Sequence, residues 1–201
     1  MNGLTENVKW SENVIIADGD YIDRVTFDLT VNFERMLGRR IPKADLGRWI
    51  DCVALDGGLR EGAHETLAVF IHSKGRERLD NFAPGDYATE IDGMAFKDNL
   101  GEFAMSALPV EGIVTHDGFV AEALQAVCAQ KAVKRVMLVA DMERMAEQVR
   151  HALRGVSDED KRVTVFAMQP LPGGNFRQEI LGYSLMSALG IRGEEIDRAT
   201  R

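Results

Sequence analysis

The sequence is poor in cysteine and contains no long apolar run. Only two of its 201 residues are cysteines, Cys52 and Cys128, and they form no CxxC pair. Two isolated thiols are most simply buried and reduced, as in proteins of a reducing compartment. The amino terminus lacks the basic and apolar regions of a signal peptide, and no apolar stretch is long enough to cross a bilayer. The sequence therefore predicts a cytoplasmic protein without a membrane partner.

Several motifs that mark large enzyme classes are also missing. There is no Walker A loop, no G-x-G-x-x-G after the first apolar strand, no H-E-x-x-H and no G-x-S-x-G. These absences disfavour nucleotide-driven motors, Rossmann dehydrogenases, zinc proteases and α/β-hydrolases. The net charge of −8 argues against a broad basic face for nucleic acid. Two local basic clusters remain, one formed by Arg35, Arg39, Arg40, Lys43 and Arg48 and the other by Lys131, Lys134 and Arg135.

What the sequence does contain is a regular alternation of apolar strands and amphipathic helices. This alternation predicts a doubly wound α/β domain, with a mostly parallel sheet of about five to six strands and helices on both faces. No linker or repeat divides residues 1–201, so we expect a single domain with a core over 13–140 and a carboxy-terminal strand and helix over 162–190. The expected strands are 13–18, 66–72, 87–91, 111–115, 134–140 and 162–168, and the expected helices are 26–37, 43–55, 95–108, 118–131, 142–153 and 176–189.

The first expected strand ends in two acids, Asp18 and Asp20, which a single glycine separates. Open α/β sheets bind ligands at the carboxyl ends of their strands, so these carboxylates are well placed for chemistry. Carboxylates that crowd together are costly unless a cation neutralises them, and Mg²⁺ and Mn²⁺ prefer such oxygen ligands. Both acids are therefore candidate metal ligands. A tight turn between strand and helix would explain the same residues without a metal.

Further acids occupy comparable positions along the chain. Asp117 and Asp141 each follow an expected strand, although each is also a favoured residue for a helix N-cap. His116, beside Asp117, is a candidate proton carrier. Asp98 and Glu102 stand four residues apart on the expected helix 95–108, so they would share one face of it. For that pair, an ordinary solvated surface is the alternative.

Three segments together resemble the NYN branch of the PIN-like nucleases. The stretch Ile-Ile-Ala-Asp-Gly-Asp-Tyr-Ile (15–22) is similar to that family's I-D-G-D-N opening. The stretch Phe-Lys-Asp-Asn-Leu-Gly-Glu-Phe (96–103) resembles its K-x-x-D helix, and Ile-Val-Thr-His-Asp-Gly-Phe (113–119) resembles its S-G-D-x-D-F segment. The similarity covers roughly residues 13–140 in the family's order.

The resemblance implies a parallel sheet in which the first and fourth strands are adjacent. Asp18 and Asp117 would then meet at one edge, with Asp98 and Glu102 above them. It implies catalytic roles for Asp18, Asp98 and Asp117, and a metal centre made by these acids together with Asp20 and Glu102. In such centres a carboxylate-held Mg²⁺ or Mn²⁺ activates water and stabilises the leaving oxygen. The implied activity is endoribonuclease cleavage, with single-stranded RNA as the partner.

The chain departs from the family pattern within these motifs. Tyr21 stands where the family has asparagine, and only Asp117 is present where it has two acids. The middle acids, Asp98 and Glu102, are offset from the expected spacing. A PIN-like, RNA-binding protein with weakened or lost catalysis would show the same departures.

Two other interpretations stay open. One is a phosphatase of the haloacid dehalogenase class, in which a D-x-D pair is combined with a strand-end hydroxyl, a lysine and a distal acid. The other is a non-catalytic interaction module, in which the acids are structural caps and the two basic clusters bind a partner. The last expected helix could pack on the sheet or mediate a homodimer. The residues of the phosphatase interpretation are Asp18, Asp20, Thr115, Lys131 or Lys134, and Asp141.

Overall fold

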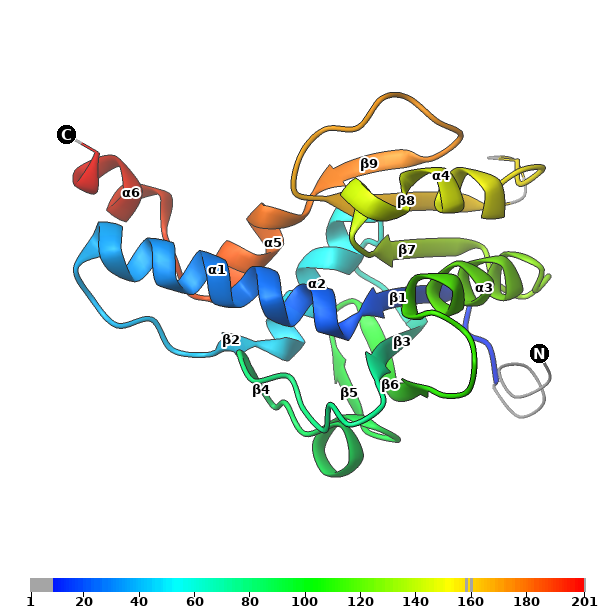
Figure 1. Ribbon diagram of the computed structural model, residues 1–201, viewed down its shortest axis with the longest axis horizontal. Helices are drawn as coiled ribbons and strands as arrows, with labels where there is room; N and C mark the ends of the chain where they lie inside the picture. Colours follow the sequence, from blue (N-terminus) through cyan, green and yellow to red (C-terminus); the bar gives the residue numbers. More distant parts are fainter. Residues whose placement is uncertain (1–8, 158, 160, 201) are drawn as a thin grey trace.

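The computed structural model describes residues 9–157, 159 and 161–200. The argument about a signal peptide rests largely on residues 1–8, which lie outside the described part of the chain. As predicted, the protein has an α/β fold in which helices cover both faces of a mostly parallel sheet (Figure 1).

Seven strands form the main sheet in the order β5-β6-β3-β1-β7-β8-β9, and every neighbouring pair except β5 and β6 is parallel. From β1 the chain builds outward first through β3 and β6, and then in the other direction through β7, β8 and β9. This reversal is the switch point of a doubly wound sheet. The strands are β1 (Asn13–Asp18), β3 (His64–Ser73), β5 (Ala95–Asp98), β6 (Gly101–Val110), β7 (Arg135–Val139), β8 (Arg162–Ala167) and β9 (Arg177–Ile180).

The helices form two layers. One face of the sheet packs against α1, α2 and α5, and the other packs against α3 and α4. A short parallel pair, β2 (Ala44–Asp45) and β4 (Phe82–Ala83), lies outside the main sheet. In the described residues, no helix combines the length and the apolar character needed to cross a membrane. The helices are α1 (Gly19–Leu37), α2 (Leu46–Asp56), α3 (His116–Cys128), α4 (Met142–Ala152), α5 (Leu181–Ala188) and α6 (Gly193–Ala199).

The central strand β1 holds the core together. Its alternate side chains enter opposite layers, so Ile15 packs with α1, α2 and α5, while Val14 and Ile16 pack with α3 and α4. All three side chains are fully buried. Each contributes roughly 1.5–3 kcal/mol relative to an exposed position. The carboxyl end of β1 is therefore a firmly anchored position for functional side chains.

The first helix begins earlier than the sequence predicts. We expected a start near residue 26, but α1 begins at Gly19 because the Asp18 side chain accepts a hydrogen bond from the Tyr21 amide at 3.1 Å. Tyr21 and Ile22 are buried, so the apolar stripe already starts in the first turn. The helix ends at Gly38, whose φ of +64° suits glycine.

The predicted helix 95–108 is wrong, because this segment is the antiparallel hairpin of β5 and β6. Its apolar residues fit a helical period, but β6 pairs with β3 along its whole length, and this long-range pairing decides the structure. Gly101 allows β6 to lie close to the start of β3, because a Cβ at this position would lie 2.1 Å from the carbonyl oxygen of His64. Its φ of +119° also favours glycine.

Three more predicted elements differ from the structure. The segment 87–91, predicted as an edge strand, is a single π-helical turn, η1 (Tyr87–Ile91), capped by Asp86. The segment 111–115, predicted as a strand, is the loop between β6 and α3. The predicted helix 176–189 is divided into β9 and α5, because its first residues extend the sheet beside β8.

Candidate functional site

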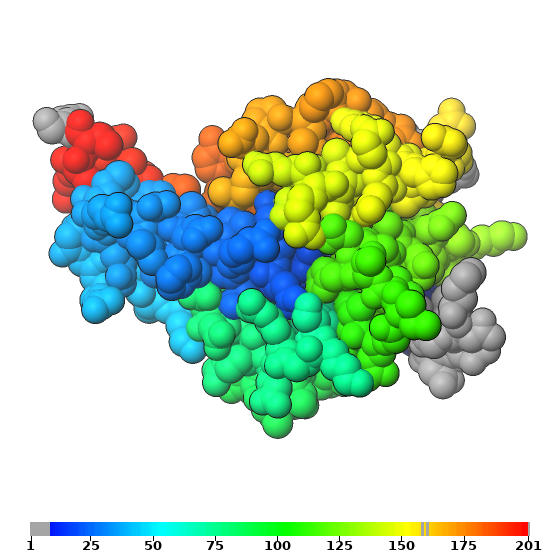
Figure 2. All heavy atoms as spheres, in the orientation of Figure 1, coloured from blue at the N-terminus to red at the C-terminus, as the bar shows by residue number. Residues whose placement is uncertain are grey.

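The carboxyl ends of β1 and β7 form the base of the site. These strands are parallel neighbours at the point where the chain order reverses, and open α/β sheets bind ligands at such a point. In Figure 2 the blue residues of α1 are bordered by the green of α3 and the yellow of α4, whose first turns meet at this edge. We call the four acids of this edge, Asp18, Asp20, Asp117 and Asp141, the acid rim.

Asp18 is nearly buried, with 3% of its surface exposed. Both hydrogen bonds that it makes with described residues end on Oδ1: one comes from the Tyr21 amide at 3.1 Å, and the other joins His116 Nε2 at 2.8 Å. The hydrogen bond to Asp18 raises the pKa of His116 above its ordinary value, with smaller contributions from the charges of Asp18, Asp20 and Asp117 against the effect of burial. The imidazolium can therefore neutralise the buried carboxylate.

Asp20 is tied to the end of β3. The Ser73 hydroxyl donates a hydrogen bond to Asp20 Oδ2, and the Ser73 amide lies 3.3 Å from both carboxylate oxygens. His116 Nδ1 lies 3.4 Å from Ser73 Oγ and 3.9 Å from Asp20 Oδ2. Arg76 Nε is 3.9 Å from the other oxygen of Asp20. The imidazole of His116 thus connects Asp18 with Asp20 and Ser73.

Asp117 and Asp141 are joined through Arg144. Its guanidinium pairs with Asp117, and its Nε lies 3.8 Å from Asp141 Oδ2. Arg24 of α1 donates a hydrogen bond to Asp141 Oδ2 at 2.9 Å. Capping explains neither acid, because Thr115 caps α3 and the side chain of Asp141 makes no capping hydrogen bond to α4. Both carboxylates instead take part in the charge network of the rim.

The glycine between Asp18 and Asp20 has a packing role. A Cβ at Gly19 would lie 2.3 Å from the hydroxyl oxygen of Tyr87 and 3.1 Å from the carbonyl oxygen of Ile71. The tyrosine ring stacks on His72, with 3.9 Å between ring centroids and 9° between planes. Burial raises the pKa of the Tyr87 hydroxyl far above its ordinary value, and the charges of three nearby aspartates add to this effect. The phenol therefore stays protonated against the acid rim.

Two of the predicted metal ligands lie far from this edge. Asp98 pairs with Gly101, which aligns with His64 at the start of β3, whereas Asp18 aligns with Ile71 near its end. The seven steps along the strand from His64 to Ile71 span roughly 23 Å. The expectation that Asp98 and Glu102 hang above Asp18 is therefore corrected: both acids belong to the hairpin, near the amino edge of the sheet. That expectation depended on a helix that does not form.

The structure also separates the residues of the phosphatase interpretation. Thr115 accepts a hydrogen bond from the backbone of α3 rather than standing at a strand end. Lys131 and Lys134 line a cavity with Cys128 just before β7, at the opposite edge of the sheet. Asp141 does reach the rim, and the strand-end hydroxyl beside Asp20 belongs to Ser73.

Sequence reasoning missed several members of the site. Ser73 directly follows the expected strand 66–72, so the strand-end rule that pointed to Asp18 also applies to Ser73. The cations Arg24, Arg76 and Arg144 gave no comparable signal, because arginines on helices and loops are usually solvated. His116 was noted as a proton carrier, but its contact with Asp18 depends on the start of α3.

Comparison with known proteins places the chain in a family. A model of a family of unknown function, DUF6621, matches residues 7–196. The chain belongs to this family. No curated protein and no solved structure matches it.

The acid rim has the oxygen ligands of a divalent-metal site but not their arrangement. Carboxylate oxygens are the ligands that Mg²⁺ and Mn²⁺ prefer, and Oδ2 of Asp18 makes no hydrogen bond to a described residue. However, no group of three or more histidine, cysteine, aspartate or glutamate side chains is placed to hold a metal within the described part. His116, Arg24 and Arg144 stand between the acids. The donor chemistry fits a hard cation, but binding would require these cationic side chains to withdraw.

Proposed function

We propose that this protein is an RNA-binding phosphodiesterase of the NYN/PIN-like type, which uses the acid rim with Mg²⁺ or Mn²⁺. One observation carries the proposal: the acids that follow the first and fourth parallel strands, β1 and β7, lie at adjacent strand ends. The resemblance to that family implies this adjacency. Asp117, in the first turn of the helix that precedes β7, joins Asp141 through Arg144.

Under this proposal, a different segment corresponds to the family's second acid motif. The fourth parallel strand is β7, so the acid expected after that strand is Asp141 and not Asp117. The sequence Ala-Asp-Met-Glu over 140–143 also supplies two acids one residue apart, Asp141 and Glu143, as in S-G-D-x-D-F. With this assignment, the segment 113–119 no longer has to supply the motif's second acid. Asp117 becomes a middle acid in place of Asp98.

The proposal assigns a role to each part of the rim. Asp18 and Asp141 are the leading metal ligands, with Asp20 and Asp117 as supporting acids. A bound Mg²⁺ or Mn²⁺ would polarise the phosphodiester and lower the pKa of water. In the structure, His116 pairs with Asp18, and the neighbouring arginines pair with Asp117 and Asp141. These same cations would face the phosphates of a bound strand.

The test is Mn²⁺-dependent cleavage of a labelled single-stranded RNA by the wild type and by Asp18→Asn and Asp141→Asn. Asparagine keeps the capping ability of Asp18, so the variant should fold. We expect Mn²⁺ to bind the wild type in calorimetry and both variants to lose cleavage. Carefully purified wild type that binds neither Mn²⁺ nor RNA would overturn the proposal. RNA binding without cleavage would support instead a PIN-like protein that has lost catalysis.

A phosphatase remains the second candidate, because the Ser73 hydroxyl donates a hydrogen bond to Asp20 and Asp141 follows the neighbouring strand β7. Against it, the lysines that it needs lie at the other edge of the sheet. Hydrolysis of p-nitrophenyl phosphate that depends on Asp18, without RNA cleavage, would favour this candidate. The cytoplasmic location and the homodimer remain predictions. Both cysteines are free thiols, but only Cys128 is buried as predicted, whereas Cys52 is partly exposed.

A further inference from the structure

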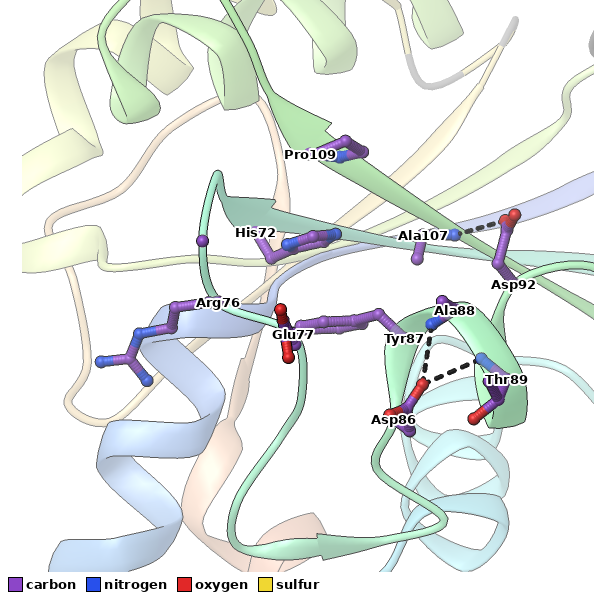
Figure 3. Close-up of a pocket in the computed structure, with 11 residues that line it drawn as sticks. His72, Arg76, Glu77, Asp86, Tyr87, Ala88, Thr89, Asp92, Ala107 and Pro109 are labelled. Atoms are coloured by element: carbon purple, nitrogen blue, oxygen red, sulfur yellow. Dashed lines mark hydrogen bonds between the residues drawn. The ribbon is translucent and has the colours of Figure 1, made fainter.

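A cavity of about 490 Å³ lies beside the acid rim (Figure 3). Its walls come from the end of β3, the loop that follows it, η1 and the second half of β6. This volume is within the usual range for small-molecule sites, which begins near 300 Å³. None of the four acids of the rim lines this cavity.

The cavity is continuous with the rim through two side chains. Tyr87, which lines the cavity, lies against the backbone of Gly19, between Asp18 and Asp20. Arg76 lines its opening and lies 3.9 Å from Asp20 and 3.6 Å from Asp23. A ligand in the cavity would therefore lie next to any phosphate held at the rim.

One wall of the cavity is rigid. His72 and Tyr87 stack on each other and are only 8% and 3% exposed, so packing fixes both rings and leaves little of either ring face open to a ligand. Ala107 and Pro109 of β6 add small apolar groups to the lining (Figure 3). A preformed site lined by aromatic and apolar groups suits a planar ring, because little side-chain entropy is lost on binding.

The charged groups of the cavity select against an anion. Three carboxylates line it, those of Glu77, Asp86 and Asp92, against the single guanidinium of Arg76. Asp86 accepts hydrogen bonds from two amides of η1, and Asp92 Oδ1 accepts one from the Ala107 amide at 2.9 Å. Glu77, in contrast, makes no side-chain hydrogen bond or ion pair with a described residue. Its carboxylate offers two acceptor oxygens to a ligand with N–H donors.

We propose that this cavity is a nucleobase subsite that prefers guanine. Guanine presents its N1–H and 2-amino group side by side, and one carboxylate can accept both. Uracil offers a single N–H between two carbonyl oxygens, which would face the carboxylates. Proteins that read single-stranded RNA commonly make hydrogen bonds to the Watson–Crick edge of an unpaired base. The subsite rests on the proposed function for its biological role, since the rim would then hold the adjoining phosphate.

The first test uses free guanosine and free uridine, without metal, measured by saturation-transfer NMR and by titration of protein chemical shifts. Neither probe carries a phosphate, so binding does not depend on the acid rim. We expect guanosine to bind the wild type at least about tenfold more tightly than uridine. Glu77→Gln should remove most of this difference, because it replaces a charged acceptor on an exposed side chain that should not affect folding.

A second pair of variants tests the position. Ala107→Trp should fill the cavity and abolish guanosine shifts, whereas Ala129→Trp, at the opposite edge of the sheet, should not. Equal binding of both nucleosides, or guanosine shifts that persist in Ala107→Trp, would overturn the subsite. If RNA cleavage depends on Asp18 but guanosine does not bind, the proposed function stands and the subsite fails. If guanosine binds as expected but RNA is never cleaved, the subsite stands and the nuclease proposal fails.

Discussion

Charged side chains gather both at the carboxyl ends and at the amino ends of the strands of the main sheet. The two edges differ in which charges lie next to each other. At the carboxyl edge each acid has a cationic neighbour: His116 for Asp18 and Asp20, and arginines for Asp117 and Asp141. At the amino edge, like charges lie together. Burial and the neighbouring Asp98 raise the pKa of Asp51 to about 7, and a buried oxygen of Asp51 has no hydrogen-bond donor within reach.

Basic side chains also lie together at the amino edge. Burial lowers the pKa of Arg135, and the nearby charges of Arg162 and Arg60 lower it further, against the opposite effect of Glu12. The acids of this edge therefore depend on a shared proton, whereas those of the carboxyl edge depend on mixed ion pairs. In the arrangement of the carboxyl edge, a metal or a cationic substrate group could take the place of the cations that now neutralise the acids.

The largest expected difference between the edges is in catalysis. Asp18→Asn should reduce RNA cleavage by about 100-fold or more, because it removes a charge that stabilises the reacting centre. Asp98→Asn, its counterpart at the amino edge, should leave cleavage within a factor of two of the wild type. Initial rates on one labelled RNA, with equal protein and Mn²⁺ concentrations, give the comparison. Equal losses in the two variants would contradict the assignment of the site to the carboxyl edge.

Much of the fold was predictable where periodicity and long-range contacts agree. The strand 13–18 and the helix 142–153 were correct to within a residue, because a buried central strand and a strongly amphipathic helix leave few alternatives. The segment 95–108 was not, because its apolar residues fit both a helix and an alternating strand. Pairing with β3 settles that choice, and no local pattern reveals it.

The site was predictable only in part for the same reason. Asp18 follows from a rule about strand ends, and the rule holds for Asp141 as well. Asp98 was assigned to the site on the basis of the predicted helix 95–108, which does not form. The wrong secondary structure therefore led to the wrong site residue. Arg24 and Arg144 reach Asp141 from different helices, and only the packed arrangement of α1 and α4 reveals that contact.

The next effect concerns the packing behind the acid rim. Gly19→Ala should destabilise the protein by about 2 kcal/mol, because the new methyl group overlaps the Tyr87 hydroxyl. Without that overlap, alanine would stabilise a helix by roughly 0.5–1 kcal/mol relative to glycine. Tyr87→Phe removes the oxygen and should recover part of the loss. Urea unfolding of the two single variants and the double variant measures this coupling, and simple additivity would contradict the overlap.

A smaller effect should appear in the pH dependence at the amino edge. The folded-state pKa of Asp51 is about 7, above its ordinary value of 3.8. Folding therefore favours its protonated form, whose contribution is complete below pH 4 and is lost as the pH rises toward 7. Because Asp51 is only partly buried, solvent screening reduces the loss to about 1 kcal/mol. Asp51→Asn should lack this slope between pH 4.5 and 7.5 in urea unfolding. A parallel slope in the variant would show that other groups cause it.

The smallest expected effect is at the rim itself. Arg144 is 57% exposed, so Arg144→Gln should change the free energy of unfolding by less than about 1 kcal/mol despite its pairing with Asp117. The same change removes a cation that competes with a metal for Asp117 and Asp141, so it should tighten Mn²⁺ binding by several-fold. Calorimetry on the variant and the wild type, at one ionic strength, measures this change. Weaker Mn²⁺ binding in Arg144→Gln would mean that the arginine organises the acids for the metal, and that the mixed ion pairs of the carboxyl edge are a permanent structure rather than an exchangeable one.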